Sequence, residues 1–402
     1  MSAMGRPGYH KTQAGWIPLA WTVDNLSDLV AVVYGKSPSE LKKLEAGFPI
    51  FGTGGVVGYT DTPLSQGPSV ILGRKGTIDK VQLSVGPFWA IDTTFYTTSR
   101  RSFDWKWLYY VMSSFDLRKL NEASGVPSLS RASLEALVIA TPPRPEQEKI
   151  AATLTAVDDK LGVLARQIDA TQTLKRGLMQ TLFSRNVGGG SDEDWFVVPL
   201  CEVAEVRTGV AKGKKGLKEP VELPYLRVAN VQDGHIDLSE VKTIAVEASQ
   251  VERYALRSGD VLMTEGGDFD KLGRGDVWEG EISPCLHQNH VFAVRPDPEK
   301  LNSYFLAALA ASDYGKQYFL SCAKRTTNLA SINSSQLKAF PVLLPPLEIQ
   351  REISEIVASA NAKVAVLKSR QAALQSLKRG LMQKLLTGEW RVKLDADEAM
   401  AA

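Results

Sequence analysis

The sequence predicts an α+β fold in which two mixed α/β domains are each followed by one long α-helix, arranged as an internal pseudo-two-fold repeat. The chain has 402 residues, of which 44% are hydrophobic, and this length is too great for one ordinary core. One segment occurs twice at a constant distance, which indicates a duplicated module. The remaining sequence consists of short apolar runs between Gly and Pro clusters, which is typical of strands and turns.

The repeated segment is Leu-Lys-Arg-Gly-Leu-Met-Gln, which stands at 174–180 and again, 203 positions later, at 377–383. The correspondence extends backwards without a gap to Pro142-Pro143 and Pro345-Pro346. This period is far too long for a solenoid, whose repeats span 20 to 50 residues. The sequence therefore contains two copies of a large module, and each copy ends in the same helix.

Each predicted helix carries apolar residues at alternating steps of three and four, which is the seam of a coiled coil. The prolines before each helix suit a first helical turn. A helix of roughly 35 to 40 residues would be on the order of 50 to 60 Å long. Packing against the core of the chain is the alternative, but two matched seams favour pairing with each other. The seam residues are Ile150, Leu154, Val157, Leu161, Leu164, Ile168, Ile353, Val357, Ala360, Val364, Leu367 and Leu374.

Gly177 and Gly380 lie inside the repeated segment. Each weakens its helix by about 1 kcal/mol relative to alanine. We therefore expect another helix or a partner protein to approach closely at both glycines.

Breaker clusters and the repeat divide the chain into seven segments. The predicted segments are an N-terminal tail (1–13), a first domain (14–142), a first long helix (143–185), a Gly-rich linker (186–194), a second domain (195–345), a second long helix (346–388) and a C-terminal tail (389–402).

Within both domains, short apolar runs come in a similar order. Residues 224–226 take the place of 49–51, residues 261–263 that of 70–72, and residues 289–292 that of 92–95. The triplet 331–333 matches 128–130 at the offset of 203. A helix is also expected from about Trp105 to Glu122. Since the domains otherwise share little sequence, we expect one fold with two different binding surfaces.

The formal charge of +2 comes from 47 basic and 45 acidic residues, so any nucleic-acid surface must be a local patch. Three cysteines form no disulfide framework, and this odd number fits a reducing cytoplasm. The first 13 residues contain no long apolar run, so neither a signal peptide nor a membrane span is expected.

Several apparent motifs do not predict chemistry. Residues 35–37 resemble the end of a phosphate-binding loop, but Val30 stands where that loop needs glycine. The glycines of 52–58 read as turn residues. Cys285 and His287 would share one face of a strand while His290 points away, so no metal site is expected. No catalytic constellation is recognisable, and the chain is expected not to be an enzyme.

Basic and amide side chains stand beside glycine turns in both domains. Arg and Lys suit guanine acceptors and phosphates, and Asn and Gln suit the adenine edge. The candidate DNA-binding residues are Lys36, Ser37, Arg74, Lys75, Thr77, Arg227, Asn230, Gln232, Lys271, Arg274, Gln288, Asn289, His290, Lys324, Arg325 and Asn328.

Two dissimilar domains that each precede the repeated helix resemble the specificity subunit of type I restriction-modification enzymes. Residues 225–231, 288–292 and the closing 385–388 add to this resemblance. It implies two target-recognition domains separated by an antiparallel pair of helices, and a cytoplasmic complex with double-stranded DNA, two modification subunits and two restriction subunits. It also implies S-adenosylmethionine in the modification subunits, ATP and Mg²⁺ in the restriction subunits, and no cofactor in this chain.

In such a complex each domain would read one half of a bipartite, asymmetric DNA target. The helices would set the spacer between the half-sites and dock the modification subunits. Two alternatives stay open: a specificity subunit of a type II-like system, and a coiled-coil scaffold that binds proteins without reading DNA.

Overall fold

The computed structural model describes residues 6–183, 195–212, 216–267, 272–325 and 330–394. The chain divides into two compact units, which are described separately. Unit 1 comprises Met1–Ala165 with Arg370–Ala402, and unit 2 comprises Arg166–Ser369. Each unit therefore combines one domain with a part of each long helix.

The first half of the chain contains β1 (Tyr9–Thr12), β2 (Gly15–Pro18), β3 (Thr22–Asn25), α1 (Leu26–Leu29), β4 (Val30–Tyr34), β5 (Phe48–Gly52), β6 (Gly55–Thr60), β7 (Ser69–Gly73), β8 (Gln82–Ser84), β9 (Trp89–Ala90), β10 (Thr94–Ser99), α2 (Trp105–Ser114), η1 (Leu117–Leu120), α3 (Arg131–Glu135), β11 (Val138–Thr141) and α4 (Arg144–Leu182).

The second half contains β12 (Phe196–Pro199), η3 (Leu200–Glu202), β13 (Ala204–Thr208), β14 (Pro220–Leu226), η4 (Val228–Asn230), β15 (Val231–Gln232), β16 (His235–Ile236), β17 (Lys242–Glu247), η5 (Ala248–Gln250), α5 (Val251–Tyr254), β18 (Val261–Thr264), β19 (Gly266–Gly267), β20 (Gly275–Val277), β21 (Leu286–His287), β22 (Val291–Pro296), α6 (Ser303–Ala311), α7 (Asp313–Cys322), β23 (Lys324–Arg325), β24 (Ala330–Ser331), α8 (Ser334–Lys338), β25 (Pro341–Leu344) and α9 (Leu347–Leu386).

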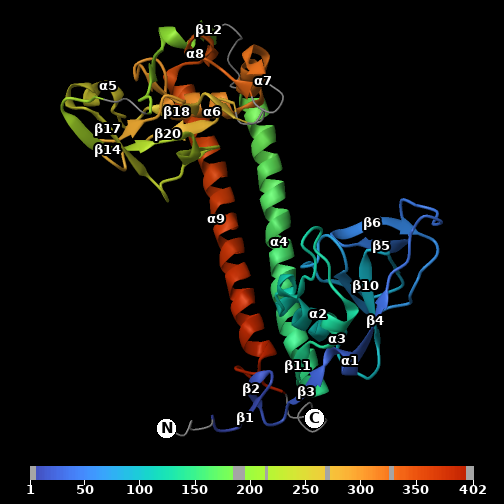
Figure 1. Ribbon diagram of the computed structural model, residues 1–402. Coiled ribbons are helices and arrows are strands. Elements are labelled where there is room, and N and C mark those ends of the chain that lie inside the picture. The colour runs from blue at the N-terminus through green and yellow to red at the C-terminus, as the bar shows by residue number, and fades with distance from the viewer. Residues whose placement is uncertain (1–5, 184–194, 213–215, 268–271, 326–329, 395–402) are drawn as a thin grey trace, which may run out of the picture. The chain divides into compact units, whose positions relative to one another are not determined.

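The main sheet of unit 1 has the strand order β4-β10-β7-β8, and every pair in it is antiparallel. A second sheet has the order β6-β5-β9, in which β5 and β9 are parallel. Figure 1 shows β4, β5, β6 and β10 gathered in one domain with α1, α2 and α3. Strand β3 pairs with β11, which leads directly into α4.

Unit 2 is built with corresponding strand orders. Its four-stranded sheet runs β13-β22-β18-β20, and β14 pairs with β17 on one side and in parallel with β21 on the other. Helix α6 packs against β18 and β20 (Figure 1). Strand β12 pairs with β25, which leads into α9.

The two ends of the long helices belong to the domain cores. In unit 1, Ile150 and Leu154 of α4 are fully buried in the same apolar cluster as Leu385 of α9. In unit 2, Ile353 and Val357 of α9 lie in the cluster that contains α6. Burial of each such side chain contributes about 1.5 to 3 kcal/mol. Four of the twelve predicted seam residues therefore also pack against a domain, as the core alternative anticipated.

A buried glutamine fixes each domain to the start of its helix. Gln147 accepts a hydrogen bond from the backbone of Asp104 at 2.8 Å, and Asp104 caps α2. In unit 2, Gln350 accepts from the backbone of Asn302 at 2.8 Å, and Asn302 caps α6. The helix and the domain that precedes it are thus joined by the same hydrogen bond in both units.

The expected tails differ from the structure. Residues 9–12 form β1, which pairs with β2, and the hydroxyl of Tyr9 donates to the carbonyl of Gly388 at 2.9 Å. Arg391 binds the buried carboxylate of Glu146 with two hydrogen bonds of 2.5 and 2.9 Å. Segments at opposite ends of the sequence therefore close unit 1 together, which local sequence patterns do not reveal.

The other element predictions agree closely with the structure. The long helices were expected at 143–185 and 346–388, and the structure has Arg144–Leu182 and Leu347–Leu386. The helix expected from about Trp105 to Glu122 is interrupted, because α2 ends at Ser114 and a 3₁₀ turn follows. Among the described residues, no helix has the length and apolar content needed to cross a membrane.

Candidate nucleic-acid interface

Three loops meet at one edge of the main sheet of unit 1. Tyr34 ends β4, Gly73 ends β7, and Thr94 begins β10, and the register places Tyr34 opposite Phe95 and Gly73 opposite Thr94. Because neighbouring strands are antiparallel, the residues after β4, after β7 and before β10 lie at the same edge. We call residues 34–37, 74–77 and 92–93 the edge of unit 1.

Arg74 is held in a defined position at this edge. Its guanidinium lies 5.2 Å from the centre of the Tyr34 ring, a cation–π contact. Its Nη1 donates to the backbone carbonyl of Asp92 at 2.9 Å. Within the described part of the chain, Nη2 and Nε have no hydrogen-bond partner. A partly exposed arginine whose guanidinium is held in place and keeps free donors is suited to binding an acceptor pair.

The remaining predicted residues of this edge are exposed. Lys36, Ser37, Lys75 and Thr77 all face solvent. Gly35 makes the bend possible, because a Cβ at this position would lie only 2.0 Å from the carbonyl oxygen of Ile91. The structure thus brings all five predicted residues of unit 1 to one edge, where the exposed lysines Lys36 and Lys75 can reach phosphates or bases.

Unit 2 has an edge of the same construction, formed by residues 208–210, 265–267 and 288–290. Thr208 lies opposite Phe292, and Thr264 lies opposite Val291. Gly209 again allows a close bend, since its Cβ would lie 2.1 Å from the carbonyl oxygen of His287.

The side chains at the edge of unit 2 are of another kind. Nδ1 of His290 lies 2.5 Å from Oε2 of Glu265, and Asn289 lies within 3.4 Å of the other ring nitrogen. Gln288 and Asn289 use their backbone amides to hold the edge, through bonds to Leu226 and Val210. Their side chains are half-buried.

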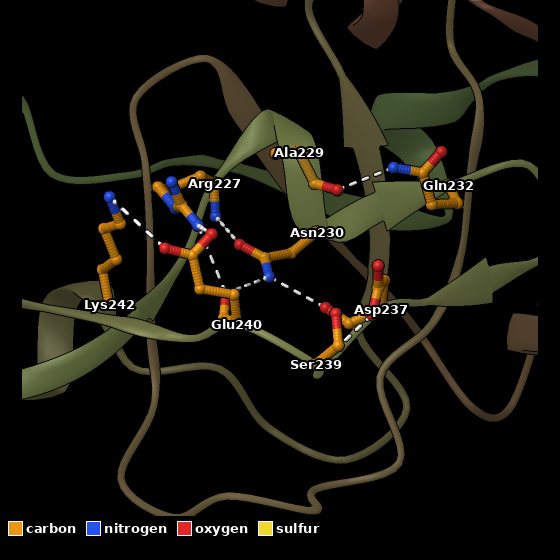
Figure 2. Close-up of polar contacts among 8 residues, drawn as sticks. All are labelled: Arg227, Ala229, Asn230, Gln232, Asp237, Ser239, Glu240 and Lys242. Carbon is orange, nitrogen blue, oxygen red and sulfur yellow. Dashed lines mark hydrogen bonds and ion pairs between the residues drawn. The ribbon is translucent and has the colours of Figure 1, made fainter. Parts of the chain in front are cut away.

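Arg227, Asn230 and Gln232 lie in a separate segment that runs from the end of β14 through η4 into β15, and the structure gives Asn230 an internal role. Figure 2 shows its amide between Arg227, Asp237 and Glu240. Oδ1 accepts from the backbone of Arg227 at 2.9 Å, and Nδ2 donates to the carbonyls of Asp237 and Glu240. The side chain is only 3% exposed, so it organises the loop and is not available to a base.

Arg227 is also partly engaged in this loop. Its Nη2 lies 3.2 Å from the carbonyl and 3.3 Å from the carboxylate of Glu240 (Figure 2). This hydrogen bond, followed by the charge of Lys242, lowers the pKa of Glu240. Gln232 donates to the carbonyl of Ala229 at 2.6 Å. These contacts leave less free hydrogen-bonding capacity here than at Arg74.

The other predicted residues of unit 2 are placed as follows. Nε of Arg274 is buried and has no hydrogen-bond partner among the described residues, and Lys324 is exposed at the start of β23. Lys271 and Asn328 lie outside the described residues, as does the side chain of Arg325. Sequence reasoning missed Glu265, although its position follows from the matched runs 70–72 and 261–263.

Two buried titratable groups of unit 2, His287 and Cys285, lie in the interior of the domain. Burial lowers the pKa of His287 to about 4, and its Nδ1 lies 2.7 Å from the carbonyl of Val291. Burial raises the pKa of the Cys285 thiol to about 12. Among the described residues, no group of three or more His, Cys, Asp or Glu side chains could hold a metal ion.

The repeated helix segment exposes the same side chains in both units. Leu174 in unit 2 is 62% exposed and Leu377 in unit 1 is 53% exposed. The glycine hypothesis needs correction in one respect. Among the described residues, no atom outside the adjoining turns of the same helix lies within 4 Å of a Cβ built at Gly177 or at Gly380, so no described neighbouring helix requires glycine there. The approach of a partner protein at these glycines stays a prediction.

A pocket adjoins the repeated segment in each unit. In unit 1 a pocket of about 660 Å³ is lined by Arg379, Met382 and Gln383 together with α2 and β11. In unit 2 a pocket of about 400 Å³ is lined by Arg176, Met179 and Gln180 together with the start of α7. Both pockets share an arginine, a methionine and a glutamine of the repeated segment, while their other lining residues differ.

Comparison with known proteins gives consistent results. A family model described as the type I restriction modification DNA specificity domain matches residues 18–171 and 192–376. The chain is 24% identical to the type I restriction enzyme MjaVIII specificity subunit of Methanocaldococcus jannaschii, over 94% of each chain. It is 25% identical to the EcoKI specificity subunit of Escherichia coli K12, over 69% of this chain and 64% of that relative.

A second relative from M. jannaschii is 30% identical but matches 51% of this chain and 48% of its own length. A crystal structure of the S subunit of a type I restriction-modification system from M. genitalium has a TM-score of 0.61 and 18% identity. The match covers 93% of this chain and 97% of that chain. This structural likeness concerns the fold.

Proposed function

The chain belongs to the family of type I restriction-modification DNA specificity domains, and we propose that each of its units reads one half of an asymmetric, bipartite double-stranded DNA target. The observation that carries this proposal is the pair of edges. Both are built on the same strand register, yet one presents Arg74 and the other Glu265 with His290. One scaffold with two different exposed surfaces is what a reader of two different half-sites requires.

We infer that the two units are copies of one fold related by a pseudo-two-fold axis, and that their helices pair as an antiparallel coiled coil. In unit 1, Asp158 of α4 bonds Lys378 of α9 at 2.7 Å. In unit 2, Lys175 of α4 and Asn361 of α9 line the same pocket. These two pairs exchange under the offset of 203 residues, as an antiparallel two-fold pair would.

The paired helices then act as the spacer. Helix α4 has 39 residues, which gives a length of about 58 Å at 1.5 Å per residue. One turn of DNA spans about 34 Å. The helices are therefore long enough to place the two half-sites more than one turn apart.

The repeated segment is the proposed docking site of two modification subunits. Two copies of one protein need two copies of one surface, and Leu174 with Gly177 and Leu377 with Gly380 supply exposed, identical pairs. We assign S-adenosylmethionine to those subunits, and ATP and Mg²⁺ to two restriction subunits of the complex. We assign no catalytic role to this chain.

A methylated-adenine map made with the chain and its modification subunits tests the proposal. The map should contain two half-sites separated by a fixed gap. Exchange of residues 14–142 for the first domain of another family member should alter one half-site and leave the gap and the other half-site unchanged. A change in both half-sites would contradict the proposal. So would a chain that shows no sequence-specific DNA binding at moderate salt, and that result would favour a protein-binding scaffold.

A further inference from the structure

We propose that Arg74 and Glu265 occupy the same base-reading position in the two units, and that this position distinguishes the half-sites by hydrogen-bond polarity. Arg74 presents donors and Glu265 presents an acceptor. At this position the half-site of unit 1 would carry guanine, and the half-site of unit 2 would carry cytosine. The inference rests on the proposed DNA-reading function and adds which residues read and which bases they choose.

The strand registers establish that the two positions correspond. Phe95 lies opposite Leu72 in unit 1, and Phe292 lies opposite Met263 in unit 2. Arg74 and Glu265 each come two residues after the last of these.

Backbone hydrogen bonds confirm the correspondence on both sides of the residue. The amide of Arg74 donates to the carbonyl of Thr93 at 2.8 Å, and that of Glu265 donates to His290 at 3.0 Å. The carbonyl of Arg74 accepts from Leu129 at 2.9 Å, and that of Glu265 accepts from Ile332 at 2.8 Å. Both residues are therefore held by the same two backbone bonds.

The fold does not require either side chain. The same backbone position carries a cation in one unit and a carboxylate in the other, so the scaffold tolerates opposite charges there. Neither side chain is part of an apolar core. A difference of charge at a partly exposed position of a common scaffold is therefore expected to serve what the two units do differently, which is to read different sequences.

Both side chains are oriented before any ligand binds. The Tyr34 ring and the carbonyl of Asp92 fix the guanidinium of Arg74 and leave Nη2 and Nε without partners in the described chain. His290 binds Oε2 of Glu265, and Oε1 has no partner among the described residues. Because a carboxylate only accepts, Nδ1 of His290 carries the proton in this contact. Each side chain thus keeps free groups of one polarity.

This polarity selects the base. Arginine donates to O6 and N7 of guanine in the major groove, and a carboxylate accepts from N4 of cytosine. A glutamine at the same place would instead suit the N6 and N7 of adenine. Each good contact of this kind discriminates against the wrong base by roughly tenfold or more.

Two substitutions test the inference in the complex with the modification subunits. Arg74→Ala should make one base pair of one half-site degenerate, with a loss of discrimination of roughly tenfold or more. Glu265→Gln should change one base pair of the other half-site from C·G towards A·T. The readout is the methylated-adenine map, and the gap should stay constant in both variants. Lys11→Ala, which removes an exposed cation from the β1–β2 hairpin of unit 1, is the control and should give the parent map.

Several results would overturn the inference while leaving the proposed function intact. One is an unchanged map for both variants; another is a change in the same half-site for both. Uniform weakening by Arg74→Ala across all sequences would make Arg74 a phosphate contact. Failure of the proposed function looks different, because then the parent chain itself directs no sequence-specific methylation. Thermal unfolding of each variant excludes loss of folding as the cause.

Discussion

An ion pair joins the long helices in unit 1, and the described residues of unit 2 have no such pair at the corresponding place. Removing the pair should destabilise unit 1, and building one should stabilise unit 2. The carboxylate of Asp158 lies 2.7 and 2.9 Å from Nζ of Lys378 and accepts from the Tyr110 hydroxyl at 2.8 Å. At the corresponding place in unit 2, Lys175 and Asn361 line a small pocket of about 60 Å³. No carboxylate of the described residues lies within 4 Å of the Lys175 ammonium. Burial lowers the pKa of Lys175.

Asp158→Asn keeps the size of the side chain and removes its charge. The side chains of Asp158 and Lys378 are 34% and 21% exposed, so the pair is only partly screened. Exposed pairs contribute about 0.2 to 1 kcal/mol, and hydrogen bonds to charged groups about 1.5 to 3 kcal/mol. Because the hydroxyl of Tyr110 can still bond the amide, we expect the free energy of unfolding of unit 1 to fall by about 1 to 2 kcal/mol.

Asn361→Asp should have the opposite effect in unit 2. It supplies Lys175 with a carboxylate of unchanged volume, and we expect a gain of about 1 kcal/mol at neutral pH. A lysine whose folded pKa is lowered binds fewer protons in the folded state, so its contribution improves as pH rises towards its ordinary value of 10.5. The new carboxylate should make this increase in stability with rising pH smaller.

Hydrogen exchange followed by mass spectrometry can assign each change to its unit, because peptides of the two units are separate. Asp159→Asn is the matched control, since it removes the same charge from the next, exposed residue of α4. This control should change the free energy of unfolding of either unit by less than about 0.5 kcal/mol. A loss of protection in unit 2 after Asp158→Asn, or a loss in unit 2 after Asn361→Asp, would refute the correspondence of the two sites.

Three further predictions concern pH, the closure of unit 1 and the spacer. The folded pKa of His287 is about 4 and its ordinary value is 6.5. The free energy of unfolding of unit 2 should therefore fall by up to about 3 kcal/mol as pH falls from 6.5 to 4. Urea unfolding of His287→Gln should lack this pH dependence. Arg391→Met leaves the carboxylate of Glu146, which is 1% exposed, without its cation, and should cost about 2 to 3 kcal/mol. Adding Glu146→Gln should restore most of this loss in a double-mutant cycle. Inserting one or two helical turns near Ala165 and Lys368 should lengthen the gap between half-sites, and an unchanged gap in the methylation map would contradict the spacer role.

The sequence was sufficient for the elements whose signal is periodic or repeated. Helices α4 and α9 begin and end within a few residues of their expected limits, because the heptad pattern and the prolines mark them locally. The matched runs around Val70 and Val261 are both strands, β7 and β18, as their short apolar runs indicate. Such patterns depend on neighbouring residues alone.

Contacts between distant segments could not be read in the same way. Nothing near Arg391 in the sequence indicates that it binds Glu146, 245 positions earlier. Asn230 has the composition of a base-reading residue, but its amide satisfies three backbone groups of its own loop. Whether a polar side chain points outwards depends on which backbone groups the fold leaves unpaired.

The internal duplication allows structure and function to be separated within a single chain. Buried positions that differ, such as Trp107 and Phe305 one turn after their caps, show what the core accepts. Exposed positions that are identical, such as Leu174 and Leu377, are not required for packing of the core, and they point to a partner shared by both units. Partly exposed positions that differ on the same backbone, such as Arg74 and Glu265, point to different ligands. For that reason variants of the first kind should alter stability, those of the second should alter assembly, and only those of the third should alter the DNA sequence that is read.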